Sequence, residues 1–214
     1  MKRFWIFDMD GTLLDSMPIW DKVPEELLRR YGKIPAPDLR HRLISMNMEE
    51  TARYLISEYH LPIKEDAFED ASGEAIRSLY KTVYPKEGVV ELLNKLKEGG
   101  AKMCVCSATP QSYCREVLDR LGMLDRFEFI LSEDEGYTKR EPAIFMEALC
   151  RLGGTLPEEA VVCEDALHAA AAAHKAGFYV MVIEDASGKK DREELRQTAD
   201  CYISSWRELS IDAL

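Results

Sequence analysis

Short apolar runs bounded by turn residues alternate along much of this chain with segments in which apolar residues recur at helical spacing. The first run, Arg3–Phe7, is rich in aromatic and branched side chains and is typical of a buried strand. Comparable runs predict strands over 101–106, 127–131, 160–163, 178–183 and 201–203. Helices are predicted between them, over 89–97, 111–121, 142–152, 167–176 and 192–197. This alternation predicts an α/β fold with a parallel sheet and helices on both faces.

Residues 16–84 interrupt the alternation, because apolar positions there recur only at helical spacing and no run resembles a strand. The first helix expected in this segment follows Met17, and the next three cover 39–44, 49–59 and 65–80. We therefore predict two parts: a core formed by 1–15 with 85–214, and an inserted all-helical domain over 16–84.

Charge and cysteine usage narrow the class of protein. A net charge of −11 and an isoelectric point near 5.0 argue against binding to a nucleic-acid polymer or an anionic membrane. The first apolar run is cut off by Asp8 and is too short for a signal peptide. Cys104, Cys106 and Cys163 lie in predicted strands, which favours buried free thiols and a reducing cytoplasm.

Polar side chains follow three of the predicted strands. Asp8 and Asp10 come after the first, although an isolated pair of this kind is usually a solvated strand end. The second strand ends at Ser107-Ala108-Thr109, where a hydroxyl and free N–H groups suit an anion; the hydroxyls alone suit a helix N-cap. Glu164-Asp165 ends a third strand, where acidic groups also complement a helix dipole. Lys139 precedes the helix near Pro142, and a single lysine is usually a solvated charge.

Together these groups indicate phosphoryl transfer, because ligands bind beyond the carboxyl ends of parallel strands. Clustered carboxylates suit Mg²⁺, and a lysine with a hydroxyl suits a phosphoryl group. Asp8 is then placed to attack phosphorus and form an aspartyl-phosphate, and Asp10 to act as general acid and base.

Four segments of the chain resemble the four motifs of the haloacid dehalogenase superfamily. They are DMDGT, the strand ending in Ser107, TKREPAIF with Lys139, and VVCEDALHAAAAAHKAGF. The helical insertion resembles the cap of the subgroup that contains β-phosphoglucomutase and many small-molecule phosphatases. The chain departs from the family pattern at Ala166 and Ala169, which removes no catalytic group, and at Arg140-Glu141, which has no functional explanation.

The resemblance implies a Rossmann-like core, a helical cap that closes as a lid, and Mg²⁺ as cofactor. By resemblance Asp8 is the nucleophile, Asp10 the acid and base, and Ser107, Ala108 and Lys139 the phosphate-binding residues. The same resemblance assigns the metal to Asp8, Asp165 and the backbone carbonyl of Asp10, with Glu164 assisting.

The sequence specifies the type of reaction less closely than it specifies the family. Asp10 fits ester hydrolysis, because an alkoxide leaving group needs a proton. A hexose-phosphate mutase needs cap groups for a second phosphate, but Trp20 stands where the mutase has His and Met48 where it has Arg. The first hypothesis is a Mg²⁺-dependent phosphatase of a small phosphomonoester, such as a sugar phosphate or a nucleotide. A sugar phosphomutase is the alternative, and the intact motif set argues against a third, non-catalytic reading.

Substrate contacts are predicted in the cap, where Trp20, Met46, Asn47 and Met48 are the candidates, although Met and Trp on such helices are more often core. The partner is expected to be a small phosphate ester, with no nucleic-acid polymer and no membrane. The acidic surface favours neither a monomer nor a weak dimer.

Overall fold

The structure, a computed structural model, describes residues 2–43, 46 and 48–210. Its backbone divides into two compact units, one formed by 1–17 with 84–214 and the other by 18–83. Among the described residues, no helix combines the length and the apolar character needed to cross a membrane.

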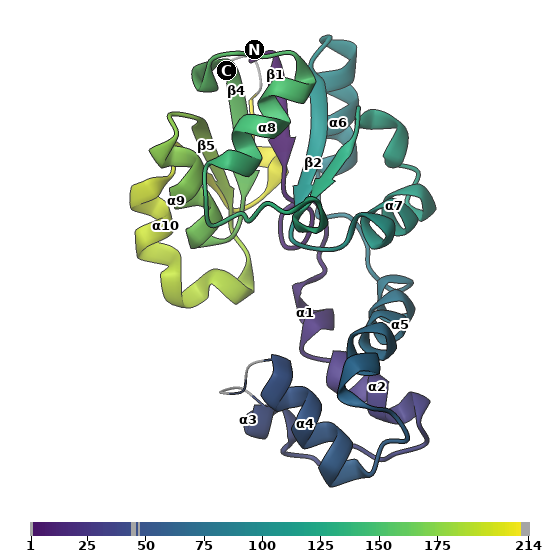
Figure 1. The fold of residues 1–214 in the computed structure, drawn as a ribbon. Helices are drawn as coiled ribbons and strands as arrows, with labels where there is room; N and C mark the ends of the chain where they lie inside the picture. The colour runs from purple at the N-terminus through teal and green to yellow at the C-terminus, as the bar shows by residue number, and fades with distance from the viewer. Residues whose placement is uncertain (1, 44–45, 47, 211–214) are drawn as a thin grey trace. The chain divides into compact units, whose positions relative to one another are not determined.

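The larger unit is built on a six-stranded sheet in which every neighbouring pair of strands is parallel. The order across the sheet is β3-β2-β1-β4-β5-β6 (Figure 1). The strands are β1 Phe4–Phe7, β2 Lys102–Ser107, β3 Ile130–Ser132, β4 Ala160–Glu164, β5 Tyr179–Ile183 and β6 Cys201–Ile203. The parallel α/β fold predicted from the alternation of strands and helices is therefore confirmed.

Helices cover both faces of the sheet because side chains along each strand point alternately to opposite sides. Phe4 and Ile6 of β1 are buried in one core cluster with residues of α8 and α9, including Ala169. Phe7 packs instead against Trp206, with ring centroids 6.1 Å apart. The helices of this unit are α6 Val89–Glu98, α7 Gln111–Arg120, α8 Ala143–Leu152, α9 Leu167–Lys175 and α10 Arg192–Thr198.

The strand order reverses beside β1, and this reversal fixes where a ligand can bind. Phe7 is in register with Val105 of β2 on one side and with Cys163 of β4 on the other. The residues that follow these three positions therefore reach one edge of the sheet together. Open parallel sheets bind ligands outside such an edge, at the point where the strand order reverses.

Several strand boundaries differ from the prediction, most of them by a single residue. β2 and β4 each run one residue further, so Ser107 and Glu164 are the last residues of their strands. β3 begins at Ile130 rather than Phe127, because Phe127 ends a short helical turn. Two residues before β3 still hydrogen-bond to β2: the Glu128 N–H donates to the Met103 carbonyl at 2.8 Å, and the Val105 N–H donates to the Phe129 carbonyl at 3.2 Å.

The smaller unit is entirely helical over the residues that the structure describes. Its elements, with the helix that leads into it, are α1 Met17–Trp20, α2 Val23–Arg30, α3 Leu39–Leu43, α4 Met48–Tyr59, the short turn Glu65–Ala67 and α5 Phe68–Tyr80. Leu27, Leu28, Leu55 and Phe68 form its buried core, as expected for helices with one apolar face.

Candidate active site

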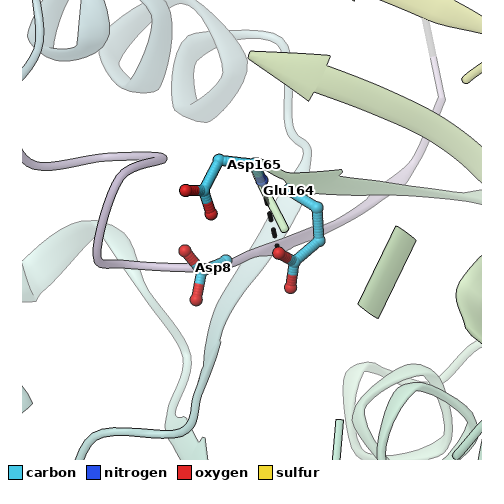
Figure 2. A group of neighbouring side chains, drawn as sticks. All are labelled: Asp8, Glu164 and Asp165. Atoms are coloured by element: carbon cyan, nitrogen blue, oxygen red, sulfur yellow. Dashed lines mark hydrogen bonds between the residues drawn. The ribbon is translucent and has the colours of Figure 1, made fainter. Parts of the chain in front are cut away.

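Three carboxylates converge where β1 and β4 end. Oxygen atoms of Asp8, Glu164 and Asp165 all lie within 4.8 Å of one another, and all three residues are buried (Figure 2). Asp8 follows the last residue of β1, and its N–H donates to the Cys163 carbonyl at 2.9 Å, so the backbone continues the sheet register to this point. The sheet itself therefore positions the cluster.

A tight turn after Asp8 lets the chain pass close to Asp165. The N–H groups of Leu13 and Leu14 both donate to the Met9 carbonyl at 3.0 Å. Gly11 has a φ of +82°, a conformation that favours glycine. A Cβ at Gly11 would lie 2.2 Å from Oδ2 of Asp165, so the glycine also leaves room for that carboxylate.

Lys139 is the cation of the cluster and is itself buried. Its Nζ lies 2.6 Å from Oδ1 of Asp8 and also pairs with Glu164. Burial alone lowers the pKa of Lys139, but the two carboxylates more than offset it and hold that pKa well above its usual range. Lys139 is therefore a permanent positive charge at the base of the site.

Asp10 lies in a separate network of hydroxyl groups. The Thr109 hydroxyl donates to Oδ2 of Asp10 at 2.7 Å, and the Ser16 hydroxyl donates to Oδ1 at 2.6 Å. The Ser107 hydroxyl oxygen accepts from the Thr109 N–H at 3.0 Å, and the N-cap position of α7 is taken by Pro110, not by Ser107 or Thr109. The N-cap interpretation of Ser107 and Thr109 is therefore wrong.

The acidic cluster carries unbalanced charge, with three carboxylates around one lysine. Burial raises the pKa of Glu164 to about 7. Burial, followed by the charges of Asp8 and Glu164, raises the pKa of Asp165 to about 9. Oδ2 of Asp8 is buried and has no hydrogen-bond partner among the described residues. A donor set made only of carboxylate oxygens fits a hard divalent cation such as Mg²⁺.

Replacing Gly11 with alanine is expected to weaken Mg²⁺ binding by about 10–100-fold, because the added Cβ displaces the Asp165 carboxylate. Gly122→Ala is the matched control: Gly122 has a φ of +65°, but a Cβ there meets no described atom within 4 Å. Both changes strain the backbone. Calorimetric titration with Mg²⁺ is expected to separate them, and equal affinities in the two variants would contradict the close approach.

The metal-free protein is expected to lose stability as the pH rises from about 5 to about 9. The pKa values of Glu164 and Asp165 are raised in the folded state. Over this pH range the two carboxyl groups therefore keep protons in the folded protein that they do not hold in the unfolded chain. A Mg²⁺ ion bound by these carboxylates would replace those protons, so it should raise the melting temperature more at the alkaline end. Thermal unfolding in EDTA and in Mg²⁺ measures this, and Asp165→Asn should flatten the dependence. An increase in melting temperature on adding Mg²⁺ that is the same at every pH would contradict this prediction.

A cavity of about 380 Å³ opens beside Asp165, at one side of the cluster. Its lining includes Asp165, His168, Ser187 and Gly188. Burial, together with the positive charges of Arg140 and Lys139, lowers the pKa of His168. A neutral imidazole therefore faces this cavity near neutral pH.

The predicted substrate contacts belong to the helical unit. Trp20 is half-buried and packs edge-on against Tyr80, with centroids 6.3 Å apart. Met46 is half-buried and Met48 is 70% exposed. Asn47 lies outside the described residues.

Sequence reasoning missed the two hydroxyl groups that hold Asp10. In the sequence, Thr109 is typical of a helix cap or an anion donor, and no pattern distinguishes Ser16. The signal available was a hydroxyl residue within a few positions of each strand end.

Comparisons with known proteins agree with this geometry. The sequence model of the family described as haloacid dehalogenase-like hydrolase matches residues 5–183. The phosphorylated carbohydrates phosphatase of Thermotoga maritima is 29% identical over 175 residues, which cover 81% of each chain. Hexitol phosphatase B of Escherichia coli is 26% identical over 211 residues, covering 96% of this chain and 93% of the relative. The solved structure of a proposed β-phosphoglucomutase from Thermotoga maritima superposes with a TM-score of 0.82 at 26% identity, covering 97% of this chain and 96% of the other.

Proposed function

The chain belongs to the haloacid dehalogenase-like hydrolase family, and we propose that it is a Mg²⁺-dependent phosphatase that works through an aspartyl-phosphate on Asp8. That it is a phosphoric monoester hydrolase rests on the family and on relatives named as phosphatases. The substrate class we propose is a phosphorylated sugar or sugar alcohol, in line with the names of two relatives.

The observation that carries this proposal is the environment of the Asp8 carboxylate. Oδ1 accepts a hydrogen bond from Lys139 at 2.6 Å, whereas buried Oδ2 has no partner among the described residues. A nucleophilic carboxylate must be held in one orientation and keep an oxygen lone pair available. Lys139 supplies the first condition, and the unbonded Oδ2 supplies the second.

In the first half-reaction, an oxygen of Asp8 forms a bond to phosphorus while the bond from phosphorus to the ester oxygen breaks. Asp10 gives a proton to the departing alcohol. In the second, Asp10 takes a proton from water, the water oxygen attacks phosphorus, and the Asp8 carboxylate is released with orthophosphate. Two carboxylates thus divide the nucleophilic and proton-transfer roles.

The phosphoryl oxygens are bound by Lys139, by the Ser107 hydroxyl and by the backbone at Ala108 in this proposal. Asp8, Asp165 and the backbone carbonyl of Asp10 would hold Mg²⁺, with Glu164 assisting. Mg²⁺, when bound, supplies positive charge beside the transferring phosphoryl group. Lys139 supplies further positive charge from the protein itself.

Thr109→Val is expected to lower kcat by about tenfold on an alkyl phosphate and by less on an aryl phosphate. Valine has nearly the shape of threonine but lacks the hydroxyl that orients Asp10. An aryl oxide leaving group needs less help from an acid than an alkoxide does. Ser16→Ala removes the other hydroxyl bond and should show the same leaving-group dependence. An equal loss on both substrates would contradict a role for Thr109 in proton transfer.

The helical unit is proposed to act as a lid that contacts the organic part of the substrate through Trp20, Met46, Asn47 and Met48. Lids of this kind exclude water and set specificity. Exchanging residues 46–48 should therefore change the preference among sugar phosphates more than the hydrolysis of a generic aryl phosphate.

The proposal is tested by measuring phosphate release from an aryl phosphate and from a panel of sugar and hexitol phosphates, in Mg²⁺ and in EDTA. Release that requires Mg²⁺ is expected. Likeness to a proposed β-phosphoglucomutase favours phosphomutase activity as the second candidate. Turnover of glucose 1-phosphate only when a hexose bisphosphate is added would favour that reaction instead.

A further inference from the structure

Three consecutive acidic residues after β3, Glu133–Glu135, each bind a different element. Oε1 of Glu133 accepts the N–H of Lys139 at 2.7 Å. Oδ2 of Asp134 accepts the N–H of Gln111, the first residue of α7, at 3.0 Å. Glu135 pairs with Arg151 of α8 at 2.9 Å.

From these contacts we propose that Glu133 and Asp134 are positioning residues, which hold the two phosphate-binding loops of the site at a fixed separation. One loop carries Lys139, and the other follows Ser107, the last residue of β2, and carries Thr109. The inference rests on the proposed function, because it assigns a role to residues that support the phosphate-binding groups without touching the substrate.

Glu133 fixes the backbone from which the Lys139 side chain starts. A carboxylate that accepts a backbone N–H makes a stronger bond than a neutral acceptor. Gly136, with a φ of +87°, lets the chain turn back so that Lys139 meets the residue six positions before it. The Lys139 ammonium must lie between Asp8 and Glu164, so a shift of its backbone moves it away from both carboxylates.

Asp134 supplies the first turn of α7 with the cap that its own segment lacks. Pro110 stands at the N-cap of α7 and makes no side-chain cap bond. The Gln111 side chain also donates to the Ile130 carbonyl at 2.7 Å, so one bond holds the start of α7 to β3 and the other holds it to the turn that follows β3. This anchoring fixes the residues just before the helix, including Thr109, whose hydroxyl bonds to Asp10.

The test compares alanine with conservative variants at each position and uses orthophosphate with Mg²⁺ as the probe. Glu133→Ala and Asp134→Ala should each raise the dissociation constant of phosphate by about tenfold or more, because small displacements of binding groups are costly. Glu133→Gln and Asp134→Asn keep an oxygen acceptor and should recover most of the affinity. Glu135→Ala is the matched control: it should lower the melting temperature but leave phosphate binding unchanged.

Amide hydrogen exchange at Lys139 and Gln111 gives a measure that does not depend on activity. Exchange should be faster at Lys139 in Glu133→Ala and at Gln111 in Asp134→Ala. Faster exchange with wild-type phosphate affinity would overturn the inference, as would a Glu135→Ala variant that binds phosphate as poorly as Glu133→Ala. A wild-type protein that binds no phosphate, yet shows these exchange changes, would instead contradict the proposed function.

Discussion

Replacing Asp8 with asparagine is expected to lower kcat for phosphate release by about 10⁴-fold or more, as removal of a catalytic nucleophile does in other enzymes. The amide has nearly the shape of the carboxylate, and its oxygen still accepts a bond from Lys139. It is, however, a far weaker nucleophile toward phosphorus. Steady-state hydrolysis of an aryl phosphate in Mg²⁺ measures the loss.

The stability of the same variant separates loss of chemistry from loss of fold. Asp8→Asn removes one of three clustered buried carboxylates, so the melting temperature in EDTA should not fall. Asp200→Asn is the matched control, because Oδ2 of Asp200 accepts the Val180 N–H at 2.8 Å in a different part of the sheet. Activity close to wild type is expected for Asp200→Asn. Substantial hydrolysis by Asp8→Asn would contradict the assignment of the nucleophile.

Replacing Lys139 with methionine should reduce kcat/KM by about 10³-fold, because the phosphoryl group loses a buried positive charge. It should also destabilise the metal-free protein by about 3–5 kcal/mol, because Asp8 and Glu164 are left buried without their partner. The loss of stability should be greatest at alkaline pH, where protonation no longer relieves the carboxylates. Denaturant unfolding in EDTA at two pH values measures this.

Lys139→Arg is the companion variant, since it keeps the charge and changes its shape. A planar guanidinium does not occupy the space of an ammonium between two carboxylates. We therefore expect Lys139→Arg to recover more stability than activity. Equal stability in the wild type and Lys139→Met would contradict the role of Lys139 in balancing the acidic cluster.

The sheet could be predicted from the sequence because its strands are short apolar runs, each followed by a polar or glycine-rich stretch. Trp5 and Ile6 are fully buried, as expected for a continuous apolar run that forms a central strand with both faces covered. The carboxyl ends of parallel strands meet at one edge of a sheet, so Asp8 and Glu164-Asp165 could be expected to lie together there. β3 was less predictable, since Phe127 packs against Phe7 from a turn rather than from a strand.

The supporting contacts could not be predicted, because they join residues far apart in the chain. The bond from Thr109 to Asp10 spans 99 positions, and nothing in the local sequence distinguishes it from a helix cap. The same holds for the close approach of Gly11 to Asp165, where only the folded backbone shows that a side chain has no room. Composition marks Glu133–Glu135 as acidic, but only the structure gives each carboxylate a partner.

Trapping the phosphorylated enzyme tests the role of Asp8 most directly. In Asp10→Asn, an aryl phosphate should still phosphorylate Asp8, because its leaving group needs little help from an acid, whereas attack by water is slow without a base. Borohydride reduces an acyl phosphate to an alcohol, and peptide mass spectrometry locates the change. We predict conversion of Asp8 to homoserine, absent when Asp8→Asn is added. Reduction at another residue, or continued turnover with Asp8 never modified, would contradict the account.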